Sequence, residues 1–431
     1  MSSIPNLSDG GLTPSHEISI LLRDILLARE PVAVMLINGF KVTRFQFARD
    51  RTIGDSQISS RFVHAAALEL TLDSGLKGLG FLNSIMFPLP AENEIIRIFE
   101  AEVWPSLKGQ SVGALAHRIR RPRGGNIFRS SVPFDEAVQQ AVWDLLAKVL
   151  GLPLWRLLGA DRNRVRAYAS GLDFHLPDAD FVALFERAAM LGFDSFKIKV
   201  GHTDIDRDIH RLDLLKSAVG PDATVMADAN EAWSPKEAVR NLDCFRRAGH
   251  LLHWIEDPIL RNDFAGLKFV KQHSASTLVN AGEYLDVSGK RELLESDSID
   301  MLNVHGQITD MMHIGWLAAD RGIPVTVGNT FLELGVNLAV ALPNVQWLEY
   351  SFMNLEHLVE KPFEIRGGYI YASEAPGHGL DLTDEARRRW HSPMVLDSNS
   401  MGEGPEQFRL ADALHRRSMP QVRDASTADH S

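Results

Sequence analysis

The most restrictive feature of the 431-residue sequence lies after residue 160, where short β-branched runs alternate with amphipathic segments. Strands separated by helices must run parallel, because a crossover returns the chain to the same edge of the sheet. Eight such units with nearly continuous apolar strands favour a closed α/β barrel over an open sheet. The runs span residues 165–169, 195–200, 224–227, 253–255, 277–281, 299–304, 324–327 and 345–348.

The segments between these runs carry residues that begin and end helices. Ser234 to Glu237 reads Ser-Pro-Lys-Glu, a capping box with proline in the first helical position. Gly322 and Pro324 end the helix that precedes them. These signals support helical connections between the strands.

The region before the barrel has mixed signals and predicts an α+β unit. Residues 32–37 and 42–47 read as two strands around Asn38-Gly39, a pair typical of tight hairpin turns. The segment 65–72 fits either a strand or a helix. In residues 134–150, apolar side chains recur at helical spacing, which predicts a helix.

These patterns divide the chain into five parts. The two ends are rich in Ser, Gly, Asp and Pro and show little periodicity, so the tail is expected to be flexible. The parts are an N-terminal extension (1–30), an α+β capping domain (31–160), the barrel (161–365), a segment returning to the cap (366–400) and a C-terminal tail (401–431).

Composition excludes several classes of protein. The 45 basic and 56 acidic residues give a formal charge of −11, which argues against a broad nucleic-acid-binding face. The one cysteine, Cys244, cannot form an intrachain disulfide. No stretch approaches the roughly 18 apolar residues of a membrane span, and the first residues do not resemble a signal peptide. A soluble cytoplasmic protein with no membrane partner is therefore expected.

Three carboxylates follow consecutive predicted strands. Asp228, Glu256 and Glu283 lie 28 and 27 residues apart, about one strand-helix unit each. They should therefore sit side by side at the carboxyl-end rim, where barrels of this kind build their active sites. Carboxylates brought together repel one another, and a hard divalent cation relieves the repulsion, so we predict an Mg²⁺ site. The alternative is three solvated side chains at strand ends.

The preceding run carries Lys197 and Lys199, two residues apart and so on one side of the strand. Burying two ammonium groups together costs free energy unless anions face them. Their mutual repulsion and the field of a nearby cation are expected to lower the pKa of either, so one can act as a base. The alternative is a solvated lysine pair on an edge strand.

Together these residues resemble the enolase superfamily, in its mandelate racemase/muconate lactonizing enzyme-like branch. The matching motifs, in chain order, are Ala141 to Leu145 (AVWDL), Gly151 to Gly159 (GLPLWRLLG), Lys197-x-Lys199, Asp228-x-Asn230, Glu256 in Ile-Glu-Asp-Pro, Gly282-Glu283, and Trp347-Leu348-Glu349.

The resemblance implies a modified (β/α)7β TIM barrel closed by an N-terminal α+β cap, with Mg²⁺ as cofactor and a symmetric homo-oligomer. It implies that the substrate is a small carboxylate from which a lysine removes the adjacent proton. Asn230, Asn329 and Glu349 then become candidate substrate-binding residues.

One departure from the family pattern bears on the reaction. The seventh strand of mandelate racemase-like enzymes offers a His paired with an Asp from the sixth, whereas here the corresponding position is Asn329. His305 follows the sixth strand instead and is either a structural histidine or an acid that protonates a leaving hydroxyl.

Racemisation through opposed bases needs a proton acceptor on each face of the substrate, whereas dehydration needs one base and one acid. Because acid-sugar dehydratases are frequent in the branch that this sequence resembles, dehydration of an acid sugar by a hydro-lyase is the leading hypothesis. Racemase, epimerase or cycloisomerase chemistry at the same metal remains an alternative, as does a catalytically silent metal-binding scaffold. Arg44, Arg49 and Arg51 either bind a second substrate carboxylate or solvate a surface.

Overall fold

The computed structural model describes residues 35–84, 88–116, 132–328 and 330–389. The predicted N-terminal extension and C-terminal tail lie outside these residues. Across the described ranges, no helix has the length and apolar character needed to cross a membrane.

The described part of the cap contains an antiparallel sheet of order β1-β2-β3 and the long helix α4. Gly78 and Gly80 allow α4 to lie directly on β3, because a Cβ at Gly80 would sit 1.9 Å from the carbonyl oxygen of Ala137. The elements are β1 (Ile37–Gly54), β2 (Ser59–Leu72), β3 (Lys77–Ser84), α2 (Glu92–Ile98), η1 (Phe99–Val103), η2 (Trp104–Ser106), α3 (Val112–Ala116), α4 (Asp135–Val149) and α5 (Leu154–Leu157).

The hairpin predicted at Asn38-Gly39 is wrong. β1 runs straight through this pair, which causes a register shift against β2 between Ile37 and Gly39. Neither residue adopts the positive φ that a two-residue hairpin turn requires. The chain reverses at residues 55–58 instead, where Asp55 Oδ1 accepts hydrogen bonds from two backbone N–H groups. The ambiguous segment 65–72 is strand, within β2.

In the described residues, eight parallel strands follow one another from β4 to β11, and pairing of β11 with β4 closes the barrel. Each predicted run overlaps one of these strands, so the predicted fold class is confirmed. The strands are β4 (Arg164–Ser170), β5 (Ser195–Lys199), β6 (Thr224–Asp228), β7 (Trp254–Glu256), β8 (Leu278–Ala281), β9 (Met301–Val304), β10 (Val325–Val327) and β11 (Val345–Tyr350).

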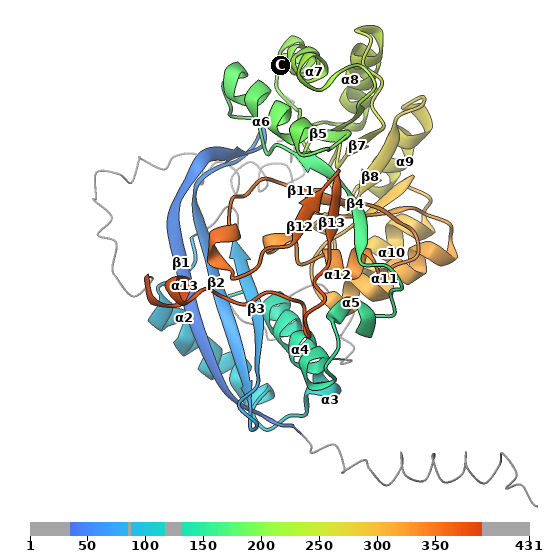
Figure 1. Ribbon diagram of the computed structural model, residues 1–431. Helices are drawn as coiled ribbons and strands as arrows, with labels where there is room; N and C mark the ends of the chain where they lie inside the picture. The colour runs from blue at the N-terminus through green and yellow to red at the C-terminus, as the bar shows by residue number, and fades with distance from the viewer. Residues whose placement is uncertain (1–34, 85–87, 117–131, 329, 390–431) are drawn as a thin grey trace, which may run out of the picture.

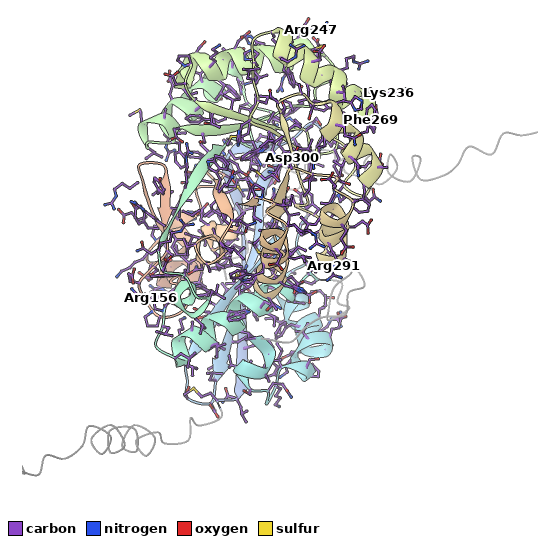
Figure 2. All side chains as sticks on the ribbon, turned by 90° about the vertical axis from the view of Figure 1, so that its right-hand side faces the viewer. Arg156, Lys236, Arg247, Phe269, Arg291 and Asp300 are labelled. Carbon is purple, nitrogen blue, oxygen red and sulfur yellow. The ribbon has the colours of Figure 1, made fainter. Side chains whose placement is uncertain are left out.

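The helices cover the outside of the barrel (Figure 1). α8 begins with the predicted capping box at Ser234 and Glu237 and buries Leu242 and Phe245. Figure 2 shows its charged residue Arg247 on the outer surface. The helical elements are α6 (Asp178–Met190), α7 (Ile205–Val219), α8 (Pro235–Arg247), α9 (Phe264–His273), α10 (Val287–Glu295), α11 (Ile308–Asp320), η3 (Phe331–Glu333), α12 (Val336–Ala339) and η4 (Glu356–Leu358).

The barrel interior is built in two layers, because alternate residues of a strand point to the same side. The lower layer is an apolar cluster near the start of the strands, made of Tyr168, Met226, Trp254, Met301 and Trp347. The upper layer lies two residues further along these strands and is polar and buried: Ser170, Asp228, Glu256, Asn303 and Glu349. Lys197, Asn280 and Thr326, also buried, complete the upper layer.

After the barrel the chain returns to the cap. A hairpin of β12 (Glu364–Arg366) and β13 (Tyr369–Tyr371) forms first, and β13 pairs antiparallel with the first three residues of β4. His378 then donates its backbone N–H to Asp144 of α4 at 2.8 Å. The chain ends its described course in α13 (Asp384–Arg389), beside the cap sheet in Figure 1.

Candidate active site

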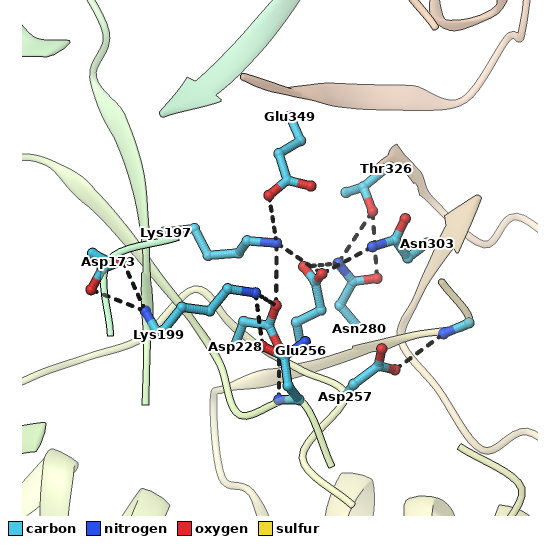
Figure 3. A network of polar contacts seen from close by, with 12 residues as sticks. Asp173, Lys197, Lys199, Asp228, Glu256, Asp257, Asn280, Asn303, Thr326 and Glu349 are labelled. Atoms are coloured by element: carbon cyan, nitrogen blue, oxygen red, sulfur yellow. Dashed lines mark hydrogen bonds and ion pairs between the residues drawn. The ribbon is translucent and has the colours of Figure 1, made fainter. Parts of the chain in front are cut away.

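Lys197 lies at the centre of the upper layer, surrounded by carboxylates from three strands (Figure 3). Its Nζ donates to Glu256 Oε1 at 2.8 Å and lies 3.1 Å from Glu349 Oε1 and 3.6 Å from Asp228 Oδ2. Below it, the ring centroid of Tyr168 is 5.1 Å from Nζ, which adds a cation–π contact. Lys197 is therefore the central positive charge of the site.

Lys199 points to the same side of β5, two residues nearer the mouth of the barrel. Its Nζ donates to Asp228 Oδ2 at 2.6 Å and to Asn230 Oδ1 at 2.8 Å. The register of β5 against β6 aligns Lys199 with Asp228, which explains the contact. Its backbone N–H donates to Asp173 Oδ1 at 3.2 Å, so both ends of the residue are held.

The expected lowering of the lysine pKa does not follow from the side chains present. Burial disfavours the ammonium form, but the carboxylates of Glu256 and Glu349 outweigh it and raise the pKa of Lys197 well above its usual value. Burial is likewise outweighed by Asp228, which raises the pKa of Lys199. Lys197 opposes this effect on the pKa of Lys199, but Asp228, Glu349 and Asp55 together outweigh it. Neutralisation of these carboxylates by a divalent cation would act in the opposite direction.

Glu256 is the most heavily bonded carboxylate of the layer. Besides Lys197, Asn303 Nδ2 donates to Oε1 at 3.0 Å and Asn280 Nδ2 to Oε2 at 3.4 Å. Burial and the nearby carboxylates of Asp228 and Glu349 still raise the pKa of Glu256 well above its usual value, despite Lys197. Burial and neighbouring carboxylates also raise the pKa of Glu283 to about 7. The site thus carries more negative charge than its lysines offset.

This charge excess tests whether the residues suit a divalent cation. Asp228 and Glu256 are paired in register on β6 and β7, and Glu283 follows the neighbouring strand β8. Within the described residues, no three His, Cys, Asp or Glu side chains surround one point as metal ligands do. Asp228 and Glu256 face the lysines instead. The donors are hard oxygens in mutual repulsion, which fits Mg²⁺ in kind, and their role as ligands stays a prediction.

Left-handed backbone gathers beside these carboxylates. Asn230, Glu231 and Asp257 have φ values of 43°, 65° and 36°, uncommon for residues with a side chain. The turn at Asn230 is held by its own N–H, which donates to Asp228 Oδ1 at 2.9 Å, and by Gln57 of the cap, which donates to its carbonyl oxygen. Strained turns held by their surroundings are typical of functional sites.

The remaining predicted residues have no described hydrogen bond to the side chains of the lysines and carboxylates. His305 is half-buried at the end of β9, and among the described residues no hydrogen bond joins it to the network of lysines and carboxylates. It acts on Glu136 of the cap: burial raises the pKa of Glu136, and His305 partly offsets the effect. Asn329 lies outside the described residues. Arg51 donates to backbone carbonyls of residues 171, 351 and 352, and so ties β1 to the barrel.

Sequence reasoning missed the amides of the upper layer and the cap residue Gln57. Asn280 and Asn303 stand within apolar runs that were predicted as strands, so a polar residue among buried ones was the available signal. Gln57 gave no such signal, because its partner Asn230 is 173 residues away in the chain.

Comparisons with known proteins agree with this architecture. Residues 52–159 match the model of the mandelate racemase/muconate lactonizing enzyme N-terminal domain, and residues 180–386 match that of the enolase C-terminal domain-like family. A solved structure of a Mesorhizobium loti protein, provisionally named a mandelate racemase, is 57% identical, with a TM-score of 0.81 over 86% of this chain and 99% of that one.

Two curated relatives catalyse different reactions. An L-talarate/galactarate dehydratase of Salmonella typhimurium is 30% identical over 69% of this chain and 71% of its own length. A 3,6-anhydro-alpha-L-galactonate cycloisomerase of Streptomyces coelicolor is 28% identical over 58% of this chain and 69% of its own. Other relatives are epimerases and a further dehydratase, so the likeness does not single out one reaction.

Proposed function

Because the chain belongs to the enolase superfamily, in its mandelate racemase/muconate lactonizing enzyme-like branch, we propose that it catalyses Mg²⁺-dependent removal of the proton adjacent to a substrate carboxylate. The reaction we propose is dehydration of an acid sugar, an aldonate or aldarate, to a 2-keto-3-deoxy acid. The observation that carries this proposal is the buried lysine pair, whose ammonium groups share Asp228.

Each residue of the pair has a distinct role in this proposal. Lys199 stands nearer the mouth of the barrel and is the base, held by Asp228 and Asn230. Lys197 stays protonated, because it is surrounded by carboxylates of the upper layer. Asp228, Glu256 and Glu283 would hold Mg²⁺, which supplies positive charge beside the substrate carboxylate. Asn230, Glu349 and Asn329 would contact the substrate.

Dehydration is favoured over racemisation by what faces the lysines. β5 and β9 are four strands apart in an eight-strand barrel, so they lie on opposite sides of it. Lys197 and Asn303 reach the same oxygen of Glu256 from these two sides. An amide cannot accept a proton as a base near neutral pH. Among the described residues of β9 and its end, His305 is the titratable side chain, and we assign it the role of acid for the leaving hydroxyl.

Epimerisation or cycloisomerisation at the same site is the second candidate, because relatives of similar identity catalyse these reactions. Such a reaction would return a proton to the substrate carbon from the His305 side without loss of water.

Incubation with a panel of aldonic and aldaric acids, in deuterated water with Mg²⁺, separates these candidates. Formation of a 2-keto-3-deoxy acid supports dehydration. Deuterium at the carbon next to the carboxylate, without loss of water, supports the second candidate and contradicts the first. Silence across the panel while Mg²⁺ binds contradicts both and indicates a scaffold that lacks turnover.

A further inference from the structure

A buried lysine outside the central network contacts the turn that carries Glu283. Lys290 lies on α10 and is 3% exposed. Its Nζ donates to the backbone carbonyl oxygen of Glu283 at 3.4 Å and to that of Leu285. In the described part of the chain, no carboxylate lies within ion-pair distance of its ammonium group. Burial of a cation without an ion-pair partner costs free energy, so a functional role would explain why a lysine occupies this position.

The turn itself is fixed at both ends. Gly282 begins it with a φ of 124°, a conformation that side chains rarely adopt, and its N–H donates to Asp257 Oδ1 at 3.3 Å. The N–H of Leu285 donates to the carbonyl oxygen of Gly282 at 3.2 Å and closes the turn. Lys290 then donates hydrogen bonds to the carbonyl oxygens of Glu283 and Leu285, on the other side of the turn. Glu283 is thus presented from a short segment clamped between Asp257 and Lys290.

The charge of Lys290 and its hydrogen bonds would affect a divalent cation in opposite ways. The ammonium group repels a cation bound by Glu283, so removal of the charge alone should strengthen binding. The hydrogen bonds hold the turn, so their removal should weaken binding, because a ligand that must first be ordered binds less tightly. The direction of the change in affinity therefore reports which effect dominates.

We propose that Lys290 is a positioning residue that holds the Glu283 turn in the conformation needed for Mg²⁺ binding. The inference rests on the proposed function, which assigns Glu283 as a metal ligand. It goes beyond that assignment, because it places a determinant of metal affinity on a helix outside the barrel mouth.

The test is the Mg²⁺ affinity of the full-length protein, measured by calorimetry without substrate. Lys290→Met removes the hydrogen bonds at similar volume and should weaken Mg²⁺ binding about tenfold, as is usual for residues that orient ligands. Lys290→Arg keeps the donors and should restore most of the affinity. Lys268→Met is the matched control, because Lys268 also donates to a backbone carbonyl, that of Ser296, but away from the site.

The outcomes separate the inference from the proposed function. Affinity that is unchanged or higher in Lys290→Met overturns the inference, and so does an equal loss in Lys268→Met. In a Glu283→Gln background, Lys290→Met should have no further effect, and an additive loss also overturns it. Should Lys290→Met fold poorly, Lys290→Leu also removes the donor and gives the same comparison. If the unaltered protein binds no Mg²⁺, or Glu283→Gln binds it normally, the metal assignment of the proposed function fails first.

Discussion

The two layers of the barrel interior differ in chemistry although the same strands build both. Met226 and Asp228 are two residues apart on β6, as are Trp254 and Glu256 on β7, and all four are almost fully buried. The degree of burial therefore does not distinguish the layers. The layers differ in the interactions that stabilise them. Close packing of apolar side chains stabilises the lower layer, and ion pairs stabilise the upper layer.

This difference shows how a barrel separates stability from function. The lower layer packs rings edge to face, with the centroids of Trp254 5.3 Å from those of both Tyr168 and Trp347. It forms an apolar floor, and charges directly above such a floor interact more strongly than they would in water. The ion pairs of the upper layer are strengthened in this way, but each charged side chain needs its partner, because an unpaired buried charge costs free energy. Substitutions in the two layers should therefore fail in different ways.

The sharpest contrast is expected from Lys199→Met. Loss of the base should lower the rate of proton removal about 10³-fold, equivalent to about 4 kcal/mol in the activation barrier. Mg²⁺ affinity should stay within a few-fold, since Lys199 is not proposed as a ligand. The measurement is exchange of the substrate proton in deuterated water. Lys216→Met, on the exposed face of α7, is the control, and normal exchange in Lys199→Met would remove this lysine as the base.

The lower layer should give the opposite result. Met301→Ala truncates a fully buried side chain and should lower the free energy of unfolding by about 3 kcal/mol through lost contacts and a cavity. Turnover per folded molecule should change little, because Asn303 two residues along keeps its place in the upper layer. Denaturant unfolding and activity at low temperature measure the two quantities. A large loss of activity in folded Met301→Ala would show that the layers are not separable.

Glu256→Gln tests the pairing that defines the upper layer. The substitution keeps the shape but removes the charge that Lys197 contacts, and it should weaken Mg²⁺ binding about 100-fold and reduce turnover with it. Calorimetry and turnover are measured together, with the exposed Glu292→Gln as control. A variant that keeps both Mg²⁺ affinity and activity would show that Glu256 is not a ligand.

The architecture was predictable from the sequence because it depends on local periodicity. A short apolar run marked each strand, and the even spacing of Asp228, Glu256 and Glu283 placed them at the ends of neighbouring strands. The Asn38-Gly39 hairpin failed for the converse reason. Its local signal was overridden by pairing of the whole of β1 with β2, which a short window does not contain.

The electrostatics of the site were not predictable, because they depend on strands far apart in the chain. Without a cation, the carboxylates of Glu256 and Glu349 raise the pKa of Lys197, and Glu349, on the last strand of the barrel, lies 3.1 Å from its Nζ. Asn303 likewise reaches Glu256 from the opposite wall. Periodicity tells which side of a strand a residue faces, but closure of the barrel decides what it meets there.

The smallest predicted effect is the pH dependence of Mg²⁺ binding through Glu283, next to the upper layer, since the lower layer has no group that titrates near neutrality. Burial and neighbouring carboxylates raise the pKa of Glu283 to about 7 in the metal-free protein, and Mg²⁺ needs the ionised form. Above pH 7 the carboxylate is already ionised, whereas below it a proton must first leave. The contribution of Glu283 to Mg²⁺ affinity should therefore be nearly constant above pH 7 and fall about tenfold, or about 1.4 kcal/mol, for each unit below it. Calorimetry at pH 6, 7 and 8, in buffers of different ionisation enthalpy, measures both the affinity and the proton released. Constant affinity from pH 8 to 6, without proton release, would place the cation away from Glu283.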